Sequence, residues 1–104
     1  MIILDTCVLI FDAIDKKKLS STAKKVIIAA EERGQLFCCD ISLWEIAMLV
    51  QKKRLKIKEE SEAFINLILK ARAIKVLEIT PLIATLSTTH PGFQHYDPAD
   101  RGWP

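Results

Sequence analysis

The chain opens with the stretch MIILDTCVLIF, residues 1–11, an apolar run that contains a single carboxylate, Asp5. Residues 2–4 are apolar and rich in β-branched side chains, a pattern typical of a strand buried on both faces of a parallel sheet. A helix or turn is expected from about Thr6. Strands of this kind occur in α/β proteins, so the opening stretch favours that fold class.

The rest of the chain continues this alternation of helices and strands. After Ser20-Ser21, apolar residues recur at helical spacing, which predicts an amphipathic helix. This helix should end near Arg33-Gly34, because a glycine suits a helix end. A second short strand is expected at 36–39. A helix through about Lys53 then follows, with Asp40 and Ser42 as candidate N-cap residues.

The remaining elements follow the same pattern. Apolar residues at helical spacing between 61 and 73 predict another helix, in this register: Ala63, Phe64, Leu67, Ile68 and Ala71. A third strand is expected at 75–79, and Thr80-Pro81 begins a short helix at 82–88. The order of elements predicts an α/β fold with a parallel sheet.

Composition indicates one globular domain over residues 1–104, because half of the residues are apolar, 27% are charged, and no linker or repeat interrupts the chain. The start of the chain lacks a basic n-region, so we expect no signal peptide or membrane anchor and a cytoplasmic location. Three cysteines, Cys7, Cys38 and Cys39, lack the spacing of a zinc or redox motif and are interpreted as small buried hydrophobes.

Three carboxylates stand beside apolar sequence: Asp5, Glu45 and Asp100. An ionised carboxylate in an apolar environment must neutralise, pair with a cation or bind a metal. Ligands of open parallel sheets bind beyond the carboxyl ends of the strands, and a right-handed crossover can bring Asp5 and Glu45 to that edge. If the three acids converge, the compensating charge would be Mg2+ or Mn2+, and metal-assisted phosphodiester cleavage is the chemistry suggested.

Structural alternatives exist for each acid. Ser42 and Glu45 match the capping box S-x-x-E, and Asp5 can act as the N-cap of the following helix. Asp97 and Asp100 can form an Asx-type turn and a local ion pair with Arg101.

Two further residues are interpreted as structural. His95 has no second histidine at the spacing of a zinc pair, so we interpret it as a surface or capping residue. Trp44 is interpreted as core packing.

The net charge of +2 is too small to indicate nucleic-acid binding, yet the cations are clustered at 16–18, 24–25 and 52–58. Each cluster is by itself explained by solvated helix ends and turns. Together they can line a groove that follows a phosphate backbone. The absence of G-x-G-x-x-G and G-x-x-x-x-G-K leaves dinucleotide and P-loop nucleotide binding without support in the sequence.

Three segments occur in order along the chain: ILDTCVL at 3–9, SLWEIAML at 42–49 and HYDPADR at 95–101. With LEITPLIA at 77–84, they resemble the PIN-domain toxins of the VapC type over nearly the whole chain. The resemblance implies a three-layer α/β/α fold and a Mg2+- or Mn2+-dependent ribonuclease of a toxin-antitoxin pair. Its partners would be RNA, a VapB-type antitoxin and a second copy of the chain.

The resemblance also assigns residues. Asp5, Glu45 and Asp100 match the family's first three acidic ligands, and Thr6 matches the hydroxyl residue that helps to position the first acid. Asp97 is expected close behind them. Candidate contacts to RNA phosphates are Arg101, Lys52, Lys53 and Arg54. The family reaction is attack of water on phosphorus, which leaves 5' phosphates on the products.

The chain departs from the family after Arg101, where Gly102-Trp103-Pro104 stand in place of an apolar helix and two strands. The resemblance therefore implies a shortened domain whose first strand is an exposed edge. Two functional classes stay open: an active ribonuclease toxin, and a catalytically impaired fragment that retains only antitoxin binding or self-association.

Overall fold

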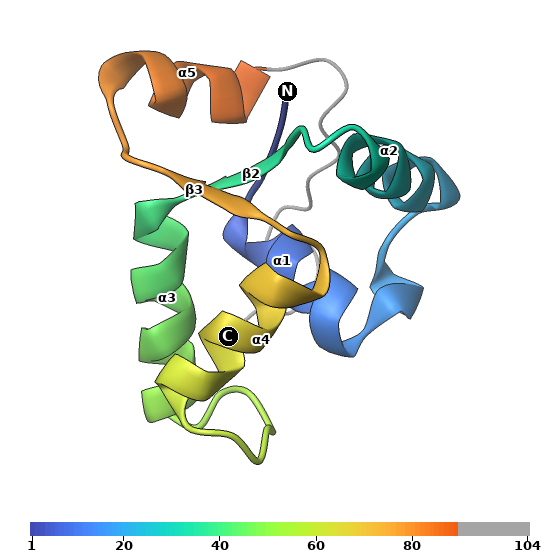
Figure 1. The fold of residues 1–104 in the computed structure, drawn as a ribbon. Helices are drawn as coiled ribbons and strands as arrows, with labels where there is room; N and C mark the ends of the chain where they lie inside the picture. Colours follow the sequence, from blue (N-terminus) through green and yellow to red (C-terminus); the bar gives the residue numbers. More distant parts are fainter. Residues whose placement is uncertain (90–104) are drawn as a thin grey trace.

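The computed structural model describes residues 1–89 of the chain (Figure 1). Its elements alternate as the sequence predicts: β1 (Ile2–Leu4), α1 (Thr6–Ile14), the 3-10 turn η1 (Lys16–Lys18), α2 (Ser21–Glu32), β2 (Leu36–Cys39), α3 (Asp40–Gln51), α4 (Ser61–Ala71), β3 (Lys75–Leu77) and α5 (Pro81–Thr89). None of the helices in this part of the chain has both the length and the apolar character that a membrane span requires.

The three strands form a parallel sheet in the order β1-β2-β3. Ile2 pairs with Leu36 and Phe37 pairs with Lys75 in the register of the two ladders. Parallel neighbours require long crossover connections, which α1 with α2 and α3 with α4 supply here. Within residues 1–89, β1 therefore lies at one edge of the sheet and β3 at the other.

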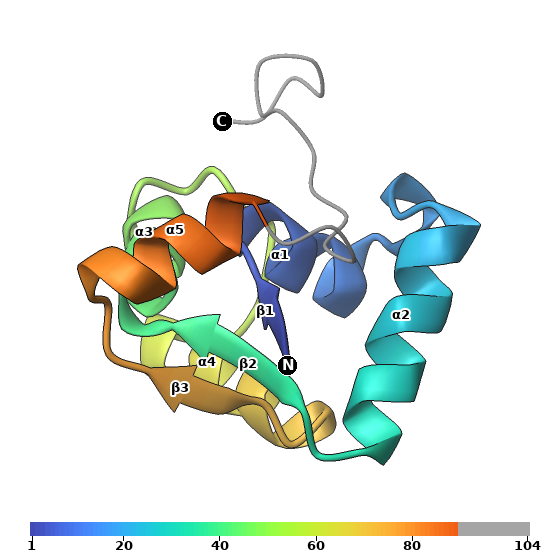
Figure 2. The same cartoon turned by 90° about the horizontal axis from the view of Figure 1, so that it is seen from above.

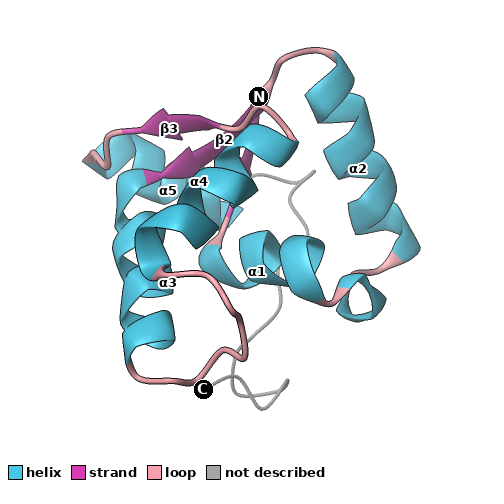
Figure 3. Cartoon of the chain, turned by 60° about the horizontal axis from the view of Figure 1, so that its bottom comes forward, coloured by secondary structure: helices cyan, strands magenta, loops and turns pink. Residues whose placement is uncertain are grey.

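Helices lie on both sides of the sheet, which gives three layers. Figure 1 shows α5 on one side and α1, α3 and α4 grouped on the other, and Figure 3 shows that group from below. Helix α2 packs near the start of β2 (Figure 2). The expected three-layer α/β/α class is confirmed.

The core lies between the sheet and the helix group. Its largest fully buried side chains come from α1, α2, β2 and α3: Leu9, Ile10, Ile27, Leu36 and Ile46. The expected apolar face of α2 is present, because Ala23, Ile27 and Ala30 are buried at helical spacing. Cys7, Cys38 and Cys39 are buried thiols, as their apolar surroundings predict.

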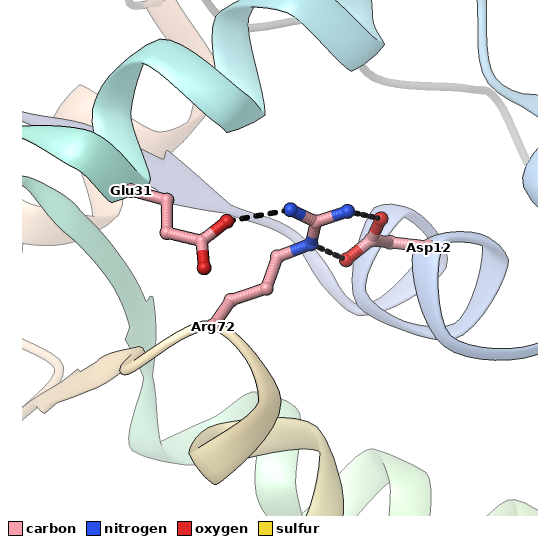
Figure 4. A network of polar contacts seen from close by, with 3 residues as sticks. All are labelled: Asp12, Glu31 and Arg72. Atoms are coloured by element: carbon pink, nitrogen blue, oxygen red, sulfur yellow. Dashed lines mark hydrogen bonds and ion pairs between the residues drawn. The ribbon is translucent and has the colours of Figure 1, made fainter.

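An ion-pair network ties the end of α4 to α1 and α2 (Figure 4). The Arg72 guanidinium donates to both carboxylate oxygens of Asp12, at 2.6 and 3.0 Å, and to Glu31 at 2.7 Å. Its hydrogen bond with Asp12 raises the pKa of Arg72 further, so the guanidinium stays protonated. The network thus connects three helices from separate parts of the chain.

Some boundaries differ from the sequence prediction. Strand β3 ends at Leu77, two residues before the expected end, and α3 and α4 end at Gln51 and Ala71. The prediction for Trp44 was wrong, because its side chain is 60% exposed. Trp44 lies two residues before the buried Ile46 on α3, so its side chain points to a different side of the helix. The position on the helix, and not the residue type, therefore decides its burial.

Candidate functional site

Asp5 stands between the end of β1 and the start of α1. Its Oδ1 accepts a hydrogen bond from the backbone N–H of Val8 at 3.0 Å, so the N-cap alternative considered for this residue is correct. A carboxylate has about four acceptor positions, and this bond uses one of them. Capping and ligation of a cation are therefore compatible at Asp5.

Thr6 joins the start of α1 to α3. Its Oγ1 lies 2.5 Å from Oε1 of Glu45 and 3.0 Å from Oγ of Ser42, residues that stand 39 and 36 positions further along the chain. The crossover thus brings the acid of α3 to the residue that follows Asp5.

The polar residues of the site differ in how far they are buried. Thr6 and Ser42 are 9% and 4% exposed, and they are the buried polar residues among the side chains that the structure describes. Asp5 is half-buried and Glu45 is exposed. The apolar sequence around Glu45 therefore does not bury this residue, although its Oε1 contacts the buried hydroxyl of Thr6.

The capping predictions for α3 were also wrong. Cys39 occupies the N-cap position, so Asp40 and Ser42 lie inside the helix and no capping box forms with Glu45. Asp40 accepts instead from the backbone N–H of Ile79, at 3.3 Å, and Ser42 contacts Thr6. Glu45 consequently lies in the second turn and not in the first.

The donor atoms around this point are oxygens of carboxylates and hydroxyls, which hard divalent cations such as Mg2+ and Mn2+ prefer. Among residues 1–89, no three side chains of His, Cys, Asp or Glu lie close enough to hold a metal ion together. Asp5 and Glu45 supply two candidate ligands. Asp97, Asp100, Arg101 and His95 lie outside the described residues.

An exposed cationic segment follows the C-terminal end of α3. Lys52, Lys53 and Arg54 are all exposed there. Glu45 and Lys52 are seven residues apart, so they lie on nearly the same helix face at a rise of roughly 10 Å. A phosphate chain that meets Glu45 can therefore run along α3 toward these cations.

Sequence reasoning missed the role of Ser42 as a partner of Thr6. The signal available was its distance of three residues from Glu45, which was interpreted as a capping box. The two roles can be distinguished only if the start of α3 is known. The capping box places Ser42 at the N-cap, whereas the structure places Cys39 there, three residues earlier.

Comparison with known proteins adds a family. A family model described as PIN domain matches residues 2–91, which is most of the chain. Neither the curated proteins nor the solved structures contain a significant match.

Proposed function

Because this chain belongs to the PIN-domain family, whose members are generally nucleases that use divalent metal ions, we propose that it is a metal-dependent endoribonuclease. The single observation that carries the proposal is the contact between Thr6 and Glu45. It brings an acid of α3 to Thr6, the residue that follows Asp5 at the carboxyl end of β1, at the edge of the sheet where α/β proteins bind ligands.

In this proposal Asp5, Glu45 and Asp100 hold one Mg2+ or Mn2+ ion, with Asp97 behind them. The ion supplies Lewis-acid stabilisation of the negative charge that develops on the phosphate during cleavage. Thr6 holds Glu45 through a hydrogen bond to one oxygen, which leaves the other oxygen of that carboxylate available. Asp5 is held by Val8, so both acids are fixed before a cation arrives.

RNA would be held by its phosphates. Lys52, Lys53 and Arg54 are proposed as one contact region and Arg101 as another. These exposed cations would bind the backbone of any nucleic acid, because contacts to phosphates carry no sequence information. The preference for RNA rests on the resemblance to VapC toxins.

We further propose that the chain is the toxin of a VapC-type pair that acts in the cytoplasm and is inhibited by a VapB-type antitoxin. Self-association is supported by an apolar patch made of Ile41, Trp44 and Ile79, all exposed. Ile41 and Trp44 share a face of α3, and the hydrogen bond from Ile79 to Asp40 places Ile79 at the start of that helix. Exposed apolar clusters of this kind mark protein interfaces.

The test is cleavage of a labelled structured RNA by the wild type and by Asp5→Asn, purified in parallel. We expect cleavage that requires Mn2+ or Mg2+, stops with EDTA and falls at least ~100-fold in the variant, because one ligand of the ion is weakened. Asn is also a good N-cap residue, so the fold of the variant should be retained. Equal cleavage by both proteins would identify a contaminating nuclease and contradict the proposal.

A further inference from the structure

Ser42 is a buried hydroxyl on α3 whose partner lies on another helix. We propose that Ser42 is a positioning residue of the metal site: it holds the hydroxyl of Thr6, and Thr6 in turn holds the carboxylate of Glu45. This inference rests on the proposed function, because the role of Glu45 as a ligand is part of that proposal.

The direction of the two hydrogen bonds follows from counting protons. Thr6 has one hydroxyl proton, and an ionised carboxylate can only accept. In the short contact of 2.5 Å, Thr6 is therefore the donor and Glu45 is the acceptor. In the 3.0 Å contact between Thr6 and Ser42, Ser42 must then be the donor. The result is a relay from Ser42 to Thr6 to Glu45.

Burial shows why Ser42 is not an ordinary helical serine. A serine inside a helix commonly satisfies its hydroxyl on the backbone of the preceding turn. Ser42 is 4% exposed and bonds instead to a side chain of α1 that is itself buried. Since a hydroxyl without a partner is costly in such surroundings, each of these two hydroxyls fixes the other.

The relay has a consequence for cation binding. With Ser42 as donor, the Thr6 oxygen has its acceptor role filled and its proton aimed at Glu45. Without Ser42, the Thr6 hydroxyl can rotate and the Glu45 side chain, which is exposed, gains freedom. Removal of a single neutral hydrogen bond behind a ligand predicts a decrease in cation affinity of about 3- to 10-fold.

The experiment measures Mn2+ affinity of the full chain by electron paramagnetic resonance of the free ion. The variants are Ser42→Ala, Thr6→Val, the double variant, and Ser42→Thr, which keeps the hydroxyl. Ser20→Ala is the matched control, because it also removes a hydroxyl that makes a 3.0 Å bond, to Ala23 at the start of α2, but lies away from the site. Circular dichroism confirms that each variant is folded.

We expect about 3- to 10-fold weaker binding in Ser42→Ala, affinity restored in Ser42→Thr, and wild-type affinity in Ser20→Ala. Because Ser42 acts through Thr6, the double variant should bind no more weakly than Thr6→Val. Unchanged affinity in Ser42→Ala, or additive decreases in the double variant, would overturn the relay while the metal site stands. A wild type that binds no Mn2+ at millimolar concentration would instead overturn the proposed function, and the relay with it.

Discussion

The hydroxyl of Thr6, the first residue of α1, lies 2.5 Å from the carboxylate of Glu45 in the second turn of α3. This contact joins the end of β1 to the helix that follows β2. Because β1 and β2 are parallel neighbours, both strands end at the same edge of the sheet, and a helix begins there after each of them. The candidate site is therefore a product of the strand order, and its residues need not be close in sequence.

Replacement of Arg72 should destabilise the fold. Arg72→Met leaves Asp12, which is largely buried, without its bidentate partner, and it also removes the ion pair with Glu31. We expect the free energy of unfolding to fall by roughly 2 kcal/mol, between the values for exposed and for buried ion pairs. Urea unfolding measures it. Arg54→Met, at an exposed position, is the control and should change the midpoint little. Equal decreases in the free energy of unfolding of the two variants would show that the ion-pair network does not stabilise the fold.

Alkaline pH should destabilise the protein through Cys38. Burial, assisted by Cys39 and Asp40, raises the pKa of the Cys38 thiol from 9.0 to about 11. The unfolded chain releases the thiol proton first, so the contribution to stability is complete below pH 9 and disappears as the pH rises toward 11. Between about pH 8 and 10.5 we expect the stability of the wild type to fall by about 2 kcal/mol more than that of Cys38→Ala. Parallel pH profiles would contradict this prediction.

Neutralisation of the cationic segment should weaken RNA binding. Replacement of all three cations, Lys52, Lys53 and Arg54, by Gln removes up to three interactions with phosphates. The slope of log affinity against log salt concentration should then fall by about 0.7 for each phosphate that is no longer bound. Fluorescence anisotropy with a labelled RNA measures the slope. The control replaces three exposed cations outside the clusters, Arg33, Lys70 and Lys75, with the same change in net charge. An equal decrease in both triple variants would mean that only net charge matters.

Self-association should depend on the apolar patch. Ile41→Lys places a charge within the apolar patch, so we expect a shift toward monomer in sedimentation velocity at micromolar concentration. Ile28→Lys, on α2, is the matched control because the side chains of Ile41 and Ile28 are exposed to nearly the same extent, 46% and 48%. A wild type that stays monomeric at high concentration would contradict this part of the proposal.

The sequence predicted the elements better than the contacts. Apolar periodicity located the helices and strands within a few residues, and the buried strand at 2–4 indicated the parallel sheet. The sequence could not identify the exact first residue of α3. That residue decides whether Ser42 caps the helix or contacts Thr6. The sequence prediction also failed for Trp44, because a large apolar side chain on a helix is buried only if its angular position faces the core.

The acid at the end of β1 shows a second limit of sequence reasoning. Asp5 was open to two interpretations, N-cap and metal ligand, and the structure shows the first, which is compatible with the second because a carboxylate has several acceptor positions. Local patterns cannot separate roles that one carboxylate can hold together. Asp100 and Asp97 lie outside the described residues, so their assignment as ligand and as support stays a prediction.

The most direct measurement for the central claim is a Mn2+ titration of the purified chain, compared with Asp5→Asn and with Asp15→Asn as a matched acid outside the site. We predict one ion bound per chain in the wild type and in Asp15→Asn, and an affinity at least ~10-fold lower in Asp5→Asn. Thermal unfolding should confirm that all three proteins are folded. Equal affinity in the three proteins, or no binding at millimolar Mn2+, would contradict the account.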